Sequence, residues 1–412
     1  MAEYLARLVD PLLDELMTDH PAVLIVGPRA CGKTTTGRRH STGRLRLDRP
    51  AEAAAVRADP DAVLADGPFP LLVDEWQAVP EVLGAVKRAV DEGSGPGRFL
   101  LTGSSQADLT TQGWPATGRV VRIVMYGLTE RETAGQVDRP PLVDGLVAQG
   151  LDGVPEPVDP PDIREYVARA LRGSFPETVL AGSDRARRRW LASYLDQVVS
   201  RDVAAIGASR DPVRLRRYLR ALAACTGGIP SVKTLVDAAG IDRRTAIAYD
   251  GLLEHLFVTE QVPAWAANRL NRLVRLPKRY LVDSAFLGPL LGVDARAVLR
   301  DNDLLGRLLD NFVVCQLRAD CVISDLSPRL FHIRDANGRR EVDILVELAD
   351  GRVIGIEVKA TAAPVPEDAR HLRWLQDALG ERFVAGVVMH TGPRRFRLGE
   401  GLYALPICTF WS

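Results

Sequence analysis

The chain has 412 residues, more than one hydrophobic core usually organises, so two to three domains are expected. Hydrophobic residues make up 46% and charged residues 26% of the chain, a composition that excludes disordered, fibrous and collagen-like proteins. Lysine plus arginine equals aspartate plus glutamate, at 53 each, so no overall charge draws the protein to nucleic acid or to a membrane.

Signals for export and for disulfide bonding are missing from the sequence. No stretch approaches the apolar length of a membrane helix, and residues 1–10 lack a signal-peptide pattern, which predicts a cytoplasmic protein. The five cysteines are scattered and form no C-x-x-C pair, which argues against a disulfide framework or a zinc site.

Residues 1–137 alternate apolar strand-like runs with helical stretches. This pattern favours an α/β fold with a parallel sheet and helices on both faces. The expected strands are Val23–Val26, Leu45–Asp48, Leu71–Asp74, Arg98–Thr102 and Val120–Met125.

A phosphate-binding loop follows the first of these strands and precedes a helical stretch. It fits the pattern G-x-x-x-x-G-K-[ST] in the context that the motif requires. Glycines let backbone N–H groups point at phosphate oxygens, while Lys33 reaches the β and γ phosphates and Thr34 binds Mg²⁺. We therefore expect ATP and Mg²⁺ here. The residues predicted to contact the nucleotide in this segment are Gly27, Pro28, Arg29, Ala30, Cys31, Gly32, Lys33, Thr34 and Thr35.

Two acidic residues come at the end of the strand Leu71–Asp74. Asp74 is placed to hold Mg²⁺ and Glu75 to polarise an attacking water, the division of work expected for phosphoryl transfer to water. The alternative is an Asp-Glu pair that only caps a strand.

Two further positions complete the predicted nucleotide site. At the end of the next strand, Thr102 or Ser104 could sense the γ-phosphate, although a strand that ends in Thr-Gly-Ser is also a common turn. Arg119, after Gly118, could stabilise the transition state in a neighbouring subunit, which would require a homo-oligomer. A solvated arginine explains Arg119 equally well.

The middle of the chain is predicted to contain a linker and two helical parts. Residues 138–161 hold six prolines and resist a packed helix, so we expect a linker or long loop. Residues 162–210 show helical periodicity and suit a helical lid over the nucleotide. Residues 211–265 contain a helix, then a turn at Gly240 and a second helix, which predicts a winged helix.

Basic residues beside the winged helix suggest contacts with nucleic acid. Arg243 and Arg244 begin the second helix, and residues 264–280 carry five cations without an acid. The alternative is a protein-binding module whose arginines are solvated.

Residues 266–412 are expected to form a C-terminal domain with a carboxylate cluster. A helix is predicted at Leu304–Arg318, a hairpin at Val342–Val358 and a helix at Pro366–Leu379. Glu357 and Lys359 share one face of a strand, and the hairpin can bring Asp343 beside them. Such a group would bind one or two Mg²⁺, or Mn²⁺, and position a water to attack phosphorus. The alternative is an edge hairpin with its polar residues outward.

The order of these motifs resembles that of AAA+ ATPases. More narrowly, Leu101-Thr-Gly-Ser-Ser105, Ser174-Phe-Pro-Glu177 and Ile356-Glu-Val-Lys359 resemble a prokaryotic family of AAA-type ATPases with an uncharacterised C-terminal domain. The chain departs from that family at Ser174, where a second glycine is expected. The resemblance covers nearly the whole chain.

This resemblance implies a P-loop NTPase core of the AAA+ type and, at the C-terminus, an α/β domain like that of restriction endonucleases. Asp343, Glu357 and Lys359 match the D…(D/E)-x-K pattern of such nucleases. These enzymes often add an acid from the preceding helix, for which Asp310 is the candidate metal ligand.

The combined prediction is an ATPase whose nucleotide state controls a nuclease-like C-terminal portion acting on nucleic acid, with DNA as the first candidate. The alternative is an ATP-dependent signalling switch or scaffold whose C-terminal domain binds a protein partner without catalysis. Salt-sensitive binding to nucleic acid would separate the two, because contacts with phosphates weaken steeply as salt rises.

Overall fold

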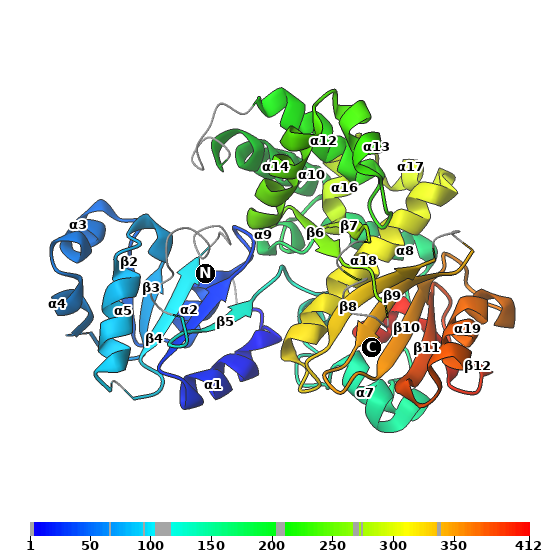
Figure 1. Ribbon diagram of the computed structural model, residues 1–412, viewed down its shortest axis with the longest axis horizontal. Coiled ribbons are helices and arrows are strands. Elements are labelled where there is room, and N and C mark those ends of the chain that lie inside the picture. Colours follow the sequence, from blue (N-terminus) through cyan, green and yellow to red (C-terminus); the bar gives the residue numbers. More distant parts are fainter. Residues whose placement is uncertain are drawn as a thin grey trace. The chain divides into compact units, whose positions relative to one another are not determined.

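The computed structural model describes residues 4–65, 67–93, 95–103, 117–202, 211–266, 272, 275–335 and 339–412. The chain divides into two compact units, of which unit 1 takes residues 1–128 with 255–257 and unit 2 takes residues 129–254 with 258–412. Figure 1 labels their helices and strands and colours the chain from its N-terminus to its C-terminus. Among the residues described, no helix has the length and apolar character that crossing a bilayer requires.

Unit 1 is built on a five-stranded sheet in which every strand runs parallel to its neighbours, in the order β2-β3-β4-β1-β5. Strands β1, β3 and β4 are buried along their whole length, as expected for parallel strands covered on both faces. All five predicted strands are present, and β3 has the predicted bounds. The bounds are β1 (Ala22–Val26), β2 (Gly43–Arg46), β3 (Leu71–Asp74), β4 (Phe99–Gly103) and β5 (Val121–Val124).

The strand order decides what meets at the edge of this sheet. Strand β4 lies between β1 and β3, and its pairing places Thr102 beside Asp74. Because the carboxyl ends of parallel strands share one edge, the loop after β1 lies at the edge that carries Asp74 and Thr102.

Helices in unit 1 pack closely on the sheet. A Cβ at Gly37 of α2 would lie 2.8 Å from Leu72 Cδ1, so only glycine allows this approach of helix to strand without a shift. The helices of unit 1 are α1 (Val9–Asp19), α2 (Lys33–Arg39), α3 (Pro50–Ala58), α4 (Pro60–Ala65) and α5 (Val82–Asp91), with a 3₁₀ turn η1 at Trp76–Ala78.

Unit 2 begins with helices where the sequence predicted a linker. Residues 138–161 contain α7 (Leu142–Gln149), whose Leu142, Val143 and Leu146 are buried, so the linker prediction is wrong. The prolines precede or follow this helix, and α7 packs against α18 and β11. Local proline content therefore misled the prediction, because tertiary packing stabilises a short helix between the prolines.

The predicted lid belongs to unit 2. It comprises α8 (Ile163–Arg172), α9 (Pro176–Val179), α10 (Asp184–Gln197) and a π-helical turn at Val198–Asp202, while residues 203–210 lie outside the described part. Helix α8 packs against α17 (Ala295–Arg300) and α18 (Asn302–Ile323), and α10 packs against α16 (Leu287–Leu291). A lid role for these helices stays a prediction.

The helices and the turn predicted within residues 211–265 are present, and the winged-helix assignment stays a prediction. Ser231 caps α13 by accepting a hydrogen bond from the Thr234 N–H at 3.0 Å, and Gly240, with φ at 65°, ends that helix in the left-handed conformation. Two strands then pair antiparallel, and the second lies beyond residue 265, so the predicted domain boundary falls inside this pair. The elements are α12 (Pro212–Ala224), α13 (Val232–Ala239), α14 (Arg243–His255), β6 (Thr259–Val262) and β7 (Lys278–Leu281).

A six-stranded mixed sheet, in the order β12-β13-β11-β10-β9-β8, completes unit 2. The pairs β8·β9, β9·β10 and β12·β13 are antiparallel, whereas β10·β11 and β11·β13 are parallel. Both the predicted hairpin and the predicted final helix are present. The bounds are β8 (Arg329–Arg334), β9 (Glu341–Glu347), β10 (Val353–Val358), α19 (Arg370–Leu379), β11 (Phe383–His390), β12 (Phe396–Gly399) and β13 (Leu402–Pro406).

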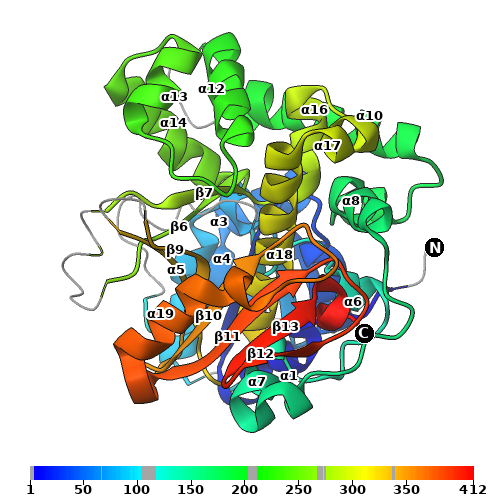
Figure 2. The same ribbon diagram turned by 90° about the vertical axis from the view of Figure 1, so that its right-hand side faces the viewer.

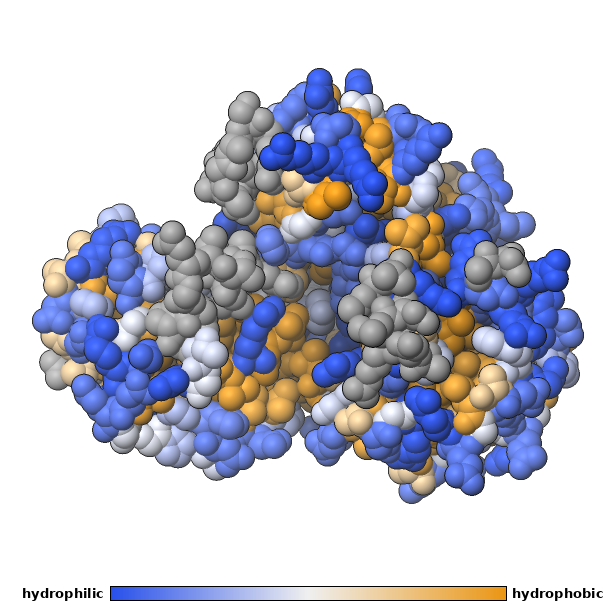
Figure 3. Space-filling model, in the orientation of Figure 1, coloured by the Kyte–Doolittle hydropathy of each residue, from blue (hydrophilic) through white to orange (hydrophobic). Residues whose placement is uncertain are grey.

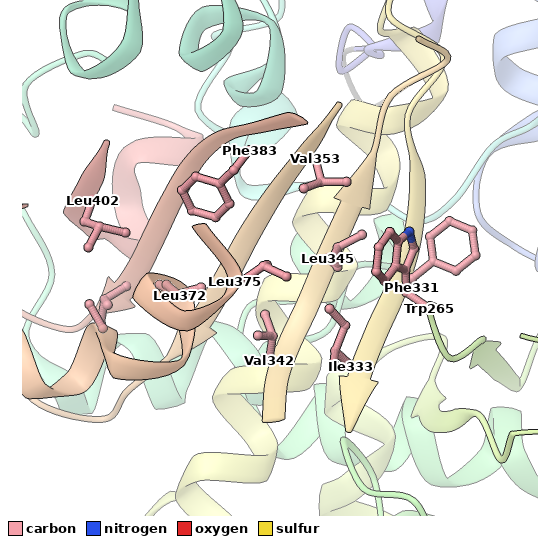
Figure 4. Close-up of a cluster of buried hydrophobic side chains, with 12 residues drawn as sticks. Trp265, Phe331, Ile333, Val342, Leu345, Val353, Leu372, Leu375, Phe383 and Leu402 are labelled. Carbon is pink, nitrogen blue, oxygen red and sulfur yellow. The ribbon is translucent and has the colours of Figure 1, made fainter. Parts of the chain in front are cut away.

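A hydrophobic cluster fixes α19 on this sheet. Leu372 and Leu375 of α19 pack over Val342, Leu345 and Val353, with α18 behind the strands (Figure 4). This core holds β9 and β10 side by side, and β9 and β10 carry the acidic residues described below. Figure 2 shows the same sheet from a direction turned by 90°.

The surface visible in Figure 3 carries hydrophilic side chains over most of both units, interrupted by hydrophobic areas. That mixture is ordinary for a folded protein, whose surface always retains apolar atoms.

Candidate functional site

The loop from Gly27 to Thr34 joins β1 to α2 in a conformation that requires small residues. A Cβ at Gly27 would lie 2.0 Å from the carbonyl oxygen of Met125, and Gly32 has a φ of 104°. Ala30, at φ 60°, also takes the left-handed conformation. The loop therefore has the tight backbone that the motif predicts.

Lys33 is buried against its own loop. Its Nζ donates hydrogen bonds to the carbonyl oxygens of Gly27 at 2.9 Å and Pro28 at 2.6 Å. This places the ammonium over the loop, where phosphate oxygens of a nucleotide would offer it further acceptors.

The other loop residues predicted to contact the nucleotide divide by exposure. Arg29, Ala30 and Thr35 are exposed, whereas Pro28 is buried, and the buried Cys31 thiol donates to the Met125 carbonyl at 3.3 Å. These three residues face solvent, while Cys31 supports the loop.

Asp74 is the centre of the hydrogen bonding at this edge of the sheet. Its Oδ1 accepts from the hydroxyls of Thr34 and Thr102, each at 2.7 Å, and its Oδ2 accepts from Arg44 at 3.1 Å. The side chain is buried, so these donors satisfy a carboxylate that is shielded from water. Sequence reasoning missed Arg44, since only the pairing of β2 with β3 brings it near.

Glu75 follows directly in a strained conformation. Its φ of 58° is rare for a residue with a side chain, and such strain concentrates at functional sites. The Glu75 N–H donates to the Thr102 hydroxyl at 3.4 Å, and its carboxylate accepts from the side-chain amide of Gln77. Glu75 thus leaves the strand in a left-handed conformation and remains partly exposed.

Residues at this edge fit a magnesium ion in the manner of P-loop proteins. Mg²⁺ is usually held by one or two protein oxygens together with phosphates and water, and the Thr34 hydroxyl and Asp74 carboxylate supply such oxygens side by side. The hydroxyl of Thr102 donates a hydrogen bond to Asp74 and so orients that carboxylate. A role of Thr102 at the γ-phosphate stays a prediction. Ser104 lies outside the described residues.

Arg119 lies at the opposite edge of the sheet. It precedes β5, which is parallel to β1, so it belongs to the amino ends of the strands and not to the loop. Its Nε donates to Asp91 Oδ1 at 2.9 Å. Arg119 therefore lies at the other end of the strands from the loop of its own chain, and its role in a neighbouring subunit stays a prediction.

A second cluster of charged residues lies in unit 2. Asp343 and Glu357 directly adjoin the last paired residues of the hairpin, Ile344 and Ile356, and the two acids are close enough to influence each other's charge. Lys359 Nζ donates to Glu357 Oε2 at 3.0 Å, and Asp343 Oδ2 accepts from the Val358 N–H at 3.1 Å. The hairpin thus brings Asp343, Glu357 and Lys359 together as predicted.

Asp310 joins this cluster from α18, but through a lysine that the sequence prediction did not place there. Lys278 of β7 is buried, and its Nζ lies 3.0 Å from Asp343 Oδ1 and 3.4 Å from Asp310 Oδ2. The hydroxyl of Tyr280 lies 3.2 Å from both carboxylate oxygens of Asp310.

Charge and burial set the protonation of these groups. Burial raises the pKa of Asp310 to about 7, against the effect of Lys278. For Asp343, burial is outweighed by Lys278 and Lys359, which lower its pKa. Burial would also lower the pKa of Lys278, but the two aspartates hold it well above its usual value. The two aspartates thus favour the charged form of Lys278.

The predicted metal site at Asp310, Asp343 and Glu357 finds no support in this arrangement. Within the described residues, no group of three or more histidine, cysteine, aspartate or glutamate side chains is placed to hold a metal ion. The physical reason is that the ammonium of Lys278 fills the space between Asp310 and Asp343.

The predicted basic stripe at 264–280 is partly internal as well. Lys278 is buried, Arg279 pairs with Asp250 at 2.8 Å, and Arg272 pairs with Glu347 at 2.6 Å. These three cations are therefore neutralised within unit 2, which weakens the case for phosphate contacts along this segment.

Comparison with known families divides the chain into three parts. Residues 19–134 match the family described as AAA domain, residues 163–297 match Domain of unknown function (DUF8612), and residues 305–410 match Domain of unknown function (DUF4143). The first match covers the loop, Asp74, Glu75 and Thr102. It supports an ATP-binding P-loop core in unit 1. The C-terminal parts are α/β and helical regions without an assigned function.

Two relatives match along most of their length. They are the uncharacterized proteins Rv2008c of Mycobacterium tuberculosis and Mb2031c of Mycobacterium bovis, each 29% identical over 392 residues, covering 94% of this chain and 80% of theirs.

Among solved structures, the Walker-type ATPase PABY2304 of Pyrococcus abyssi is 14% identical with a TM-score of 0.42, covering 68% of this chain and 94% of that one. AMPPCP-bound DnaA from Aquifex aeolicus is also 14% identical, with a TM-score of 0.23 and coverage of 60% and 85%. Both likenesses are weak, and the P-loop geometry carries the assignment.

Proposed function

We propose that this protein binds ATP with Mg²⁺ and hydrolyses it in unit 1, and that its nucleotide state controls unit 2. The observation that carries the proposal is Asp74, which receives the hydroxyls of Thr34 and Thr102 at 2.7 Å each at the edge where the phosphate loop ends. Thr34 and Asp74 would hold the metal ion, Lys33 would neutralise phosphate charge, and Glu75 would take a proton from the attacking water.

Two substitutions separate binding from hydrolysis. Lys33→Ala should abolish both, because it removes the cation from the loop, whereas Glu75→Gln should bind ATP and hydrolyse it at least about 100-fold more slowly. Phosphate release and binding of a fluorescent ATP analogue measure the two steps. Lys87→Ala serves as the matched control, since the Lys87 side chain on α5 is 39% exposed and distant in sequence from the loop. Unchanged turnover in both test variants would refute the proposal.

The route by which unit 1 controls unit 2 starts at the point where the chain passes between them. Residue 128 ends one unit, and the chain enters the other through α6 (Glu130–Thr133). Thr129 forms a capping box with Glu132, the Glu130 N–H donates to Gln316 of α18 at 2.9 Å, and Arg131 pairs with Asp320 of the same helix at 3.0 Å.

These buried bonds fasten the entry segment to α18, and α18 also carries Asp310. A displacement of the chain after β5 would therefore act on the helix that forms part of the second charged cluster. Hydrogen exchange across α18, compared between ATP-analogue and ADP states of the Glu75→Gln protein, tests this route. Equal exchange in the two states would speak against it.

For the partner of unit 2, two candidates follow from the structure. Nucleic acid is favoured by Arg243 and Arg244, which are exposed at the start of α14. A protein partner is favoured by Ile247, an apolar residue of the same helix that is 58% exposed. Binding to DNA and RNA at 50 and 200 mM salt distinguishes them: a steep loss with salt, reduced in Arg243→Ala/Arg244→Ala, indicates nucleic acid.

The nuclease hypothesis is the further candidate for unit 2. Asp343, Glu357 and Lys359 share one face of the hairpin, and a restriction-endonuclease-like fold would use such a group to cleave phosphodiesters. Incubation of DNA and RNA with Mg²⁺ or Mn²⁺ tests it, with Asp343→Ala and Lys359→Ala as the variants that must lose cleavage. The position of Lys278 weighs against cleavage.

A further inference from the structure

The charged cluster of unit 2 contains its own buried cation. The side chain of Lys278 is 1% exposed, and its ammonium lies between carboxylates contributed by α18 and β9, at 3.4 Å from Asp310 and 3.0 Å from Asp343. Lys278 lies on β7, which pairs antiparallel with β6.

These contacts compete directly with a metal ion. A divalent cation such as Mg²⁺ requires several oxygens at about 2.0 to 2.1 Å around one centre. The two carboxylate oxygens that would supply them instead face the same nitrogen, which stands in the space between them. Moreover, Asp343 Oδ2 is already bonded to the Val358 N–H, and Glu357 Oε2 to Lys359.

The charge balance leads to the same result. The cluster contains two lysines and three acids, namely Lys278, Lys359, Asp310, Asp343 and Glu357. In addition, His371 Nδ1 lies 3.7 Å from Glu357 Oε1. Burial raises the pKa of Glu357, and the adjacent Asp343 raises it further, while the nearby Glu357 carboxylate raises the pKa of His371. The acids are thus largely neutralised from within the protein, so little negative charge is left to attract an ion of charge two.

A close backbone approach shows how tightly the cluster is built. Gly227 has a φ of 69°, and a Cβ there would lie 2.7 Å from Asp310 Oδ2. The backbone at Gly227 therefore lies close against Asp310, whose carboxylate also contacts Lys278 and Tyr280.

We propose that Lys278 takes the place of the divalent cation in this cluster, so that the site neither holds a metal ion nor cleaves phosphodiesters. The carboxylates are then a fixed ion-paired centre that joins α18, β7 and β9. This inference concerns unit 2 alone and does not depend on ATP hydrolysis in unit 1.

Titration of the nucleotide-free full chain with Mn²⁺ tests the proposal, with free Mn²⁺ followed by electron paramagnetic resonance. The wild-type protein and Asp343→Asn should bind Mn²⁺ equally, because the cluster contributes nothing. A Mn²⁺ ion bound by the wild type and lost in Asp343→Asn would overturn the proposal, as would Mn²⁺-dependent cleavage of DNA or RNA lost in the same variant.

Removing the ammonium should create the site that it fills. Lys278→Met is expected to bind Mn²⁺ at least about tenfold more tightly than the wild type, and Lys278→Met/Asp343→Asn should lose that gain. Lys359→Met is the matched control, because Lys359 is 36% exposed and its loss leaves Lys278 in place. A folded Lys278→Met protein without the gain, or an equal gain in Lys359→Met, would contradict the assignment. If Lys278→Met does not fold, the Mn²⁺ titrations of the wild type and Asp343→Asn still test whether the cluster holds a metal ion.

Discussion

Replacing Thr102 with valine isolates one hydroxyl at the nucleotide site. Valine matches threonine in shape, and Thr102 is buried, so the main loss is the 2.7 Å hydrogen bond to Asp74 and the weaker bond from the Glu75 N–H at 3.4 Å. Asp74 then keeps Thr34 and Arg44 as donors but loses the one that comes from β4.

The size of the effect follows from the charge on the acceptor. A hydrogen bond to a charged group contributes about 1.5 to 3 kcal/mol, so losing the orientation of Asp74 should slow ATP hydrolysis by about 10- to 150-fold. Binding of the nucleotide should change much less, because the loop and Lys33 are untouched. Thr102→Ser keeps the hydroxyl and should hydrolyse ATP at a nearly normal rate.

Steady-state phosphate release and binding of fluorescent ATP and ADP analogues measure these outcomes, with thermal melting as the check on folding. Turnover of Thr102→Val within about twofold of the wild type would refute the positioning role. If Thr102 instead contacts the γ-phosphate, Thr102→Val would lose affinity for ATP and not for ADP. That result would restore the role predicted from the sequence.

Three further predictions concern charge pairs. Arg44→Gln removes the ion pair with Asp74, so the Mg²⁺ concentration that half-saturates ATP hydrolysis should fall by up to about fivefold, measured by Mg²⁺ titration of turnover. Arg131→Met leaves Asp320 buried without its cation and should destabilise unit 2 by about 3 to 5 kcal/mol in denaturant unfolding, with partial recovery in Arg131→Met/Asp320→Leu. Hydrogen bonds with Asp10, and next with Asp14, raise the pKa of His40. The protonated His40 therefore stabilises the fold fully below the ordinary histidine pKa, and this stabilisation is lost as pH rises through the raised pKa. The free energy of unfolding should fall more from about pH 6 to about pH 8.5 in the wild type than in His40→Gln.

The sequence predicted unit 1 well because its signals are local. Apolar runs of strand length, a glycine-rich loop and an acidic strand end all lie within short windows, and the structure places Asp74 and Thr102 at the edge they imply. The order of strands is not local, since β4 enters between β1 and β3. For that reason Arg44 was missed, and the bond of the Thr102 hydroxyl to Asp74 was not foreseen.

Unit 2 was harder to predict because its decisive contacts join distant segments. Residues 138–161 read as a linker by proline content, yet three buried apolar residues of α7 pack against α18 and β11. Lys278 was counted in a basic stripe because its neighbours in sequence are basic, whereas its partners lie 32 and 65 residues further along the chain. One signal was available: Lys278 is one of few lysines in a chain that otherwise uses arginine.

An internal ammonium changes what can regulate the cluster of unit 2. A metal-filled centre would respond to the supply of metal as well as to the position of its ligands, whereas a covalently attached cation is always present and responds only to geometry. That geometry is set by β7, β9 and α18, and α18 is also the helix to which the chain is fastened after leaving unit 1. A shift of α18 away from Lys278 would lengthen the Lys278–Asp310 contact of 3.4 Å, whereas the Lys278–Asp343 contact does not involve α18. The Lys278 cluster is therefore suited to hold α18 in place until the nucleotide state of unit 1 changes, as the proposed control of unit 2 requires.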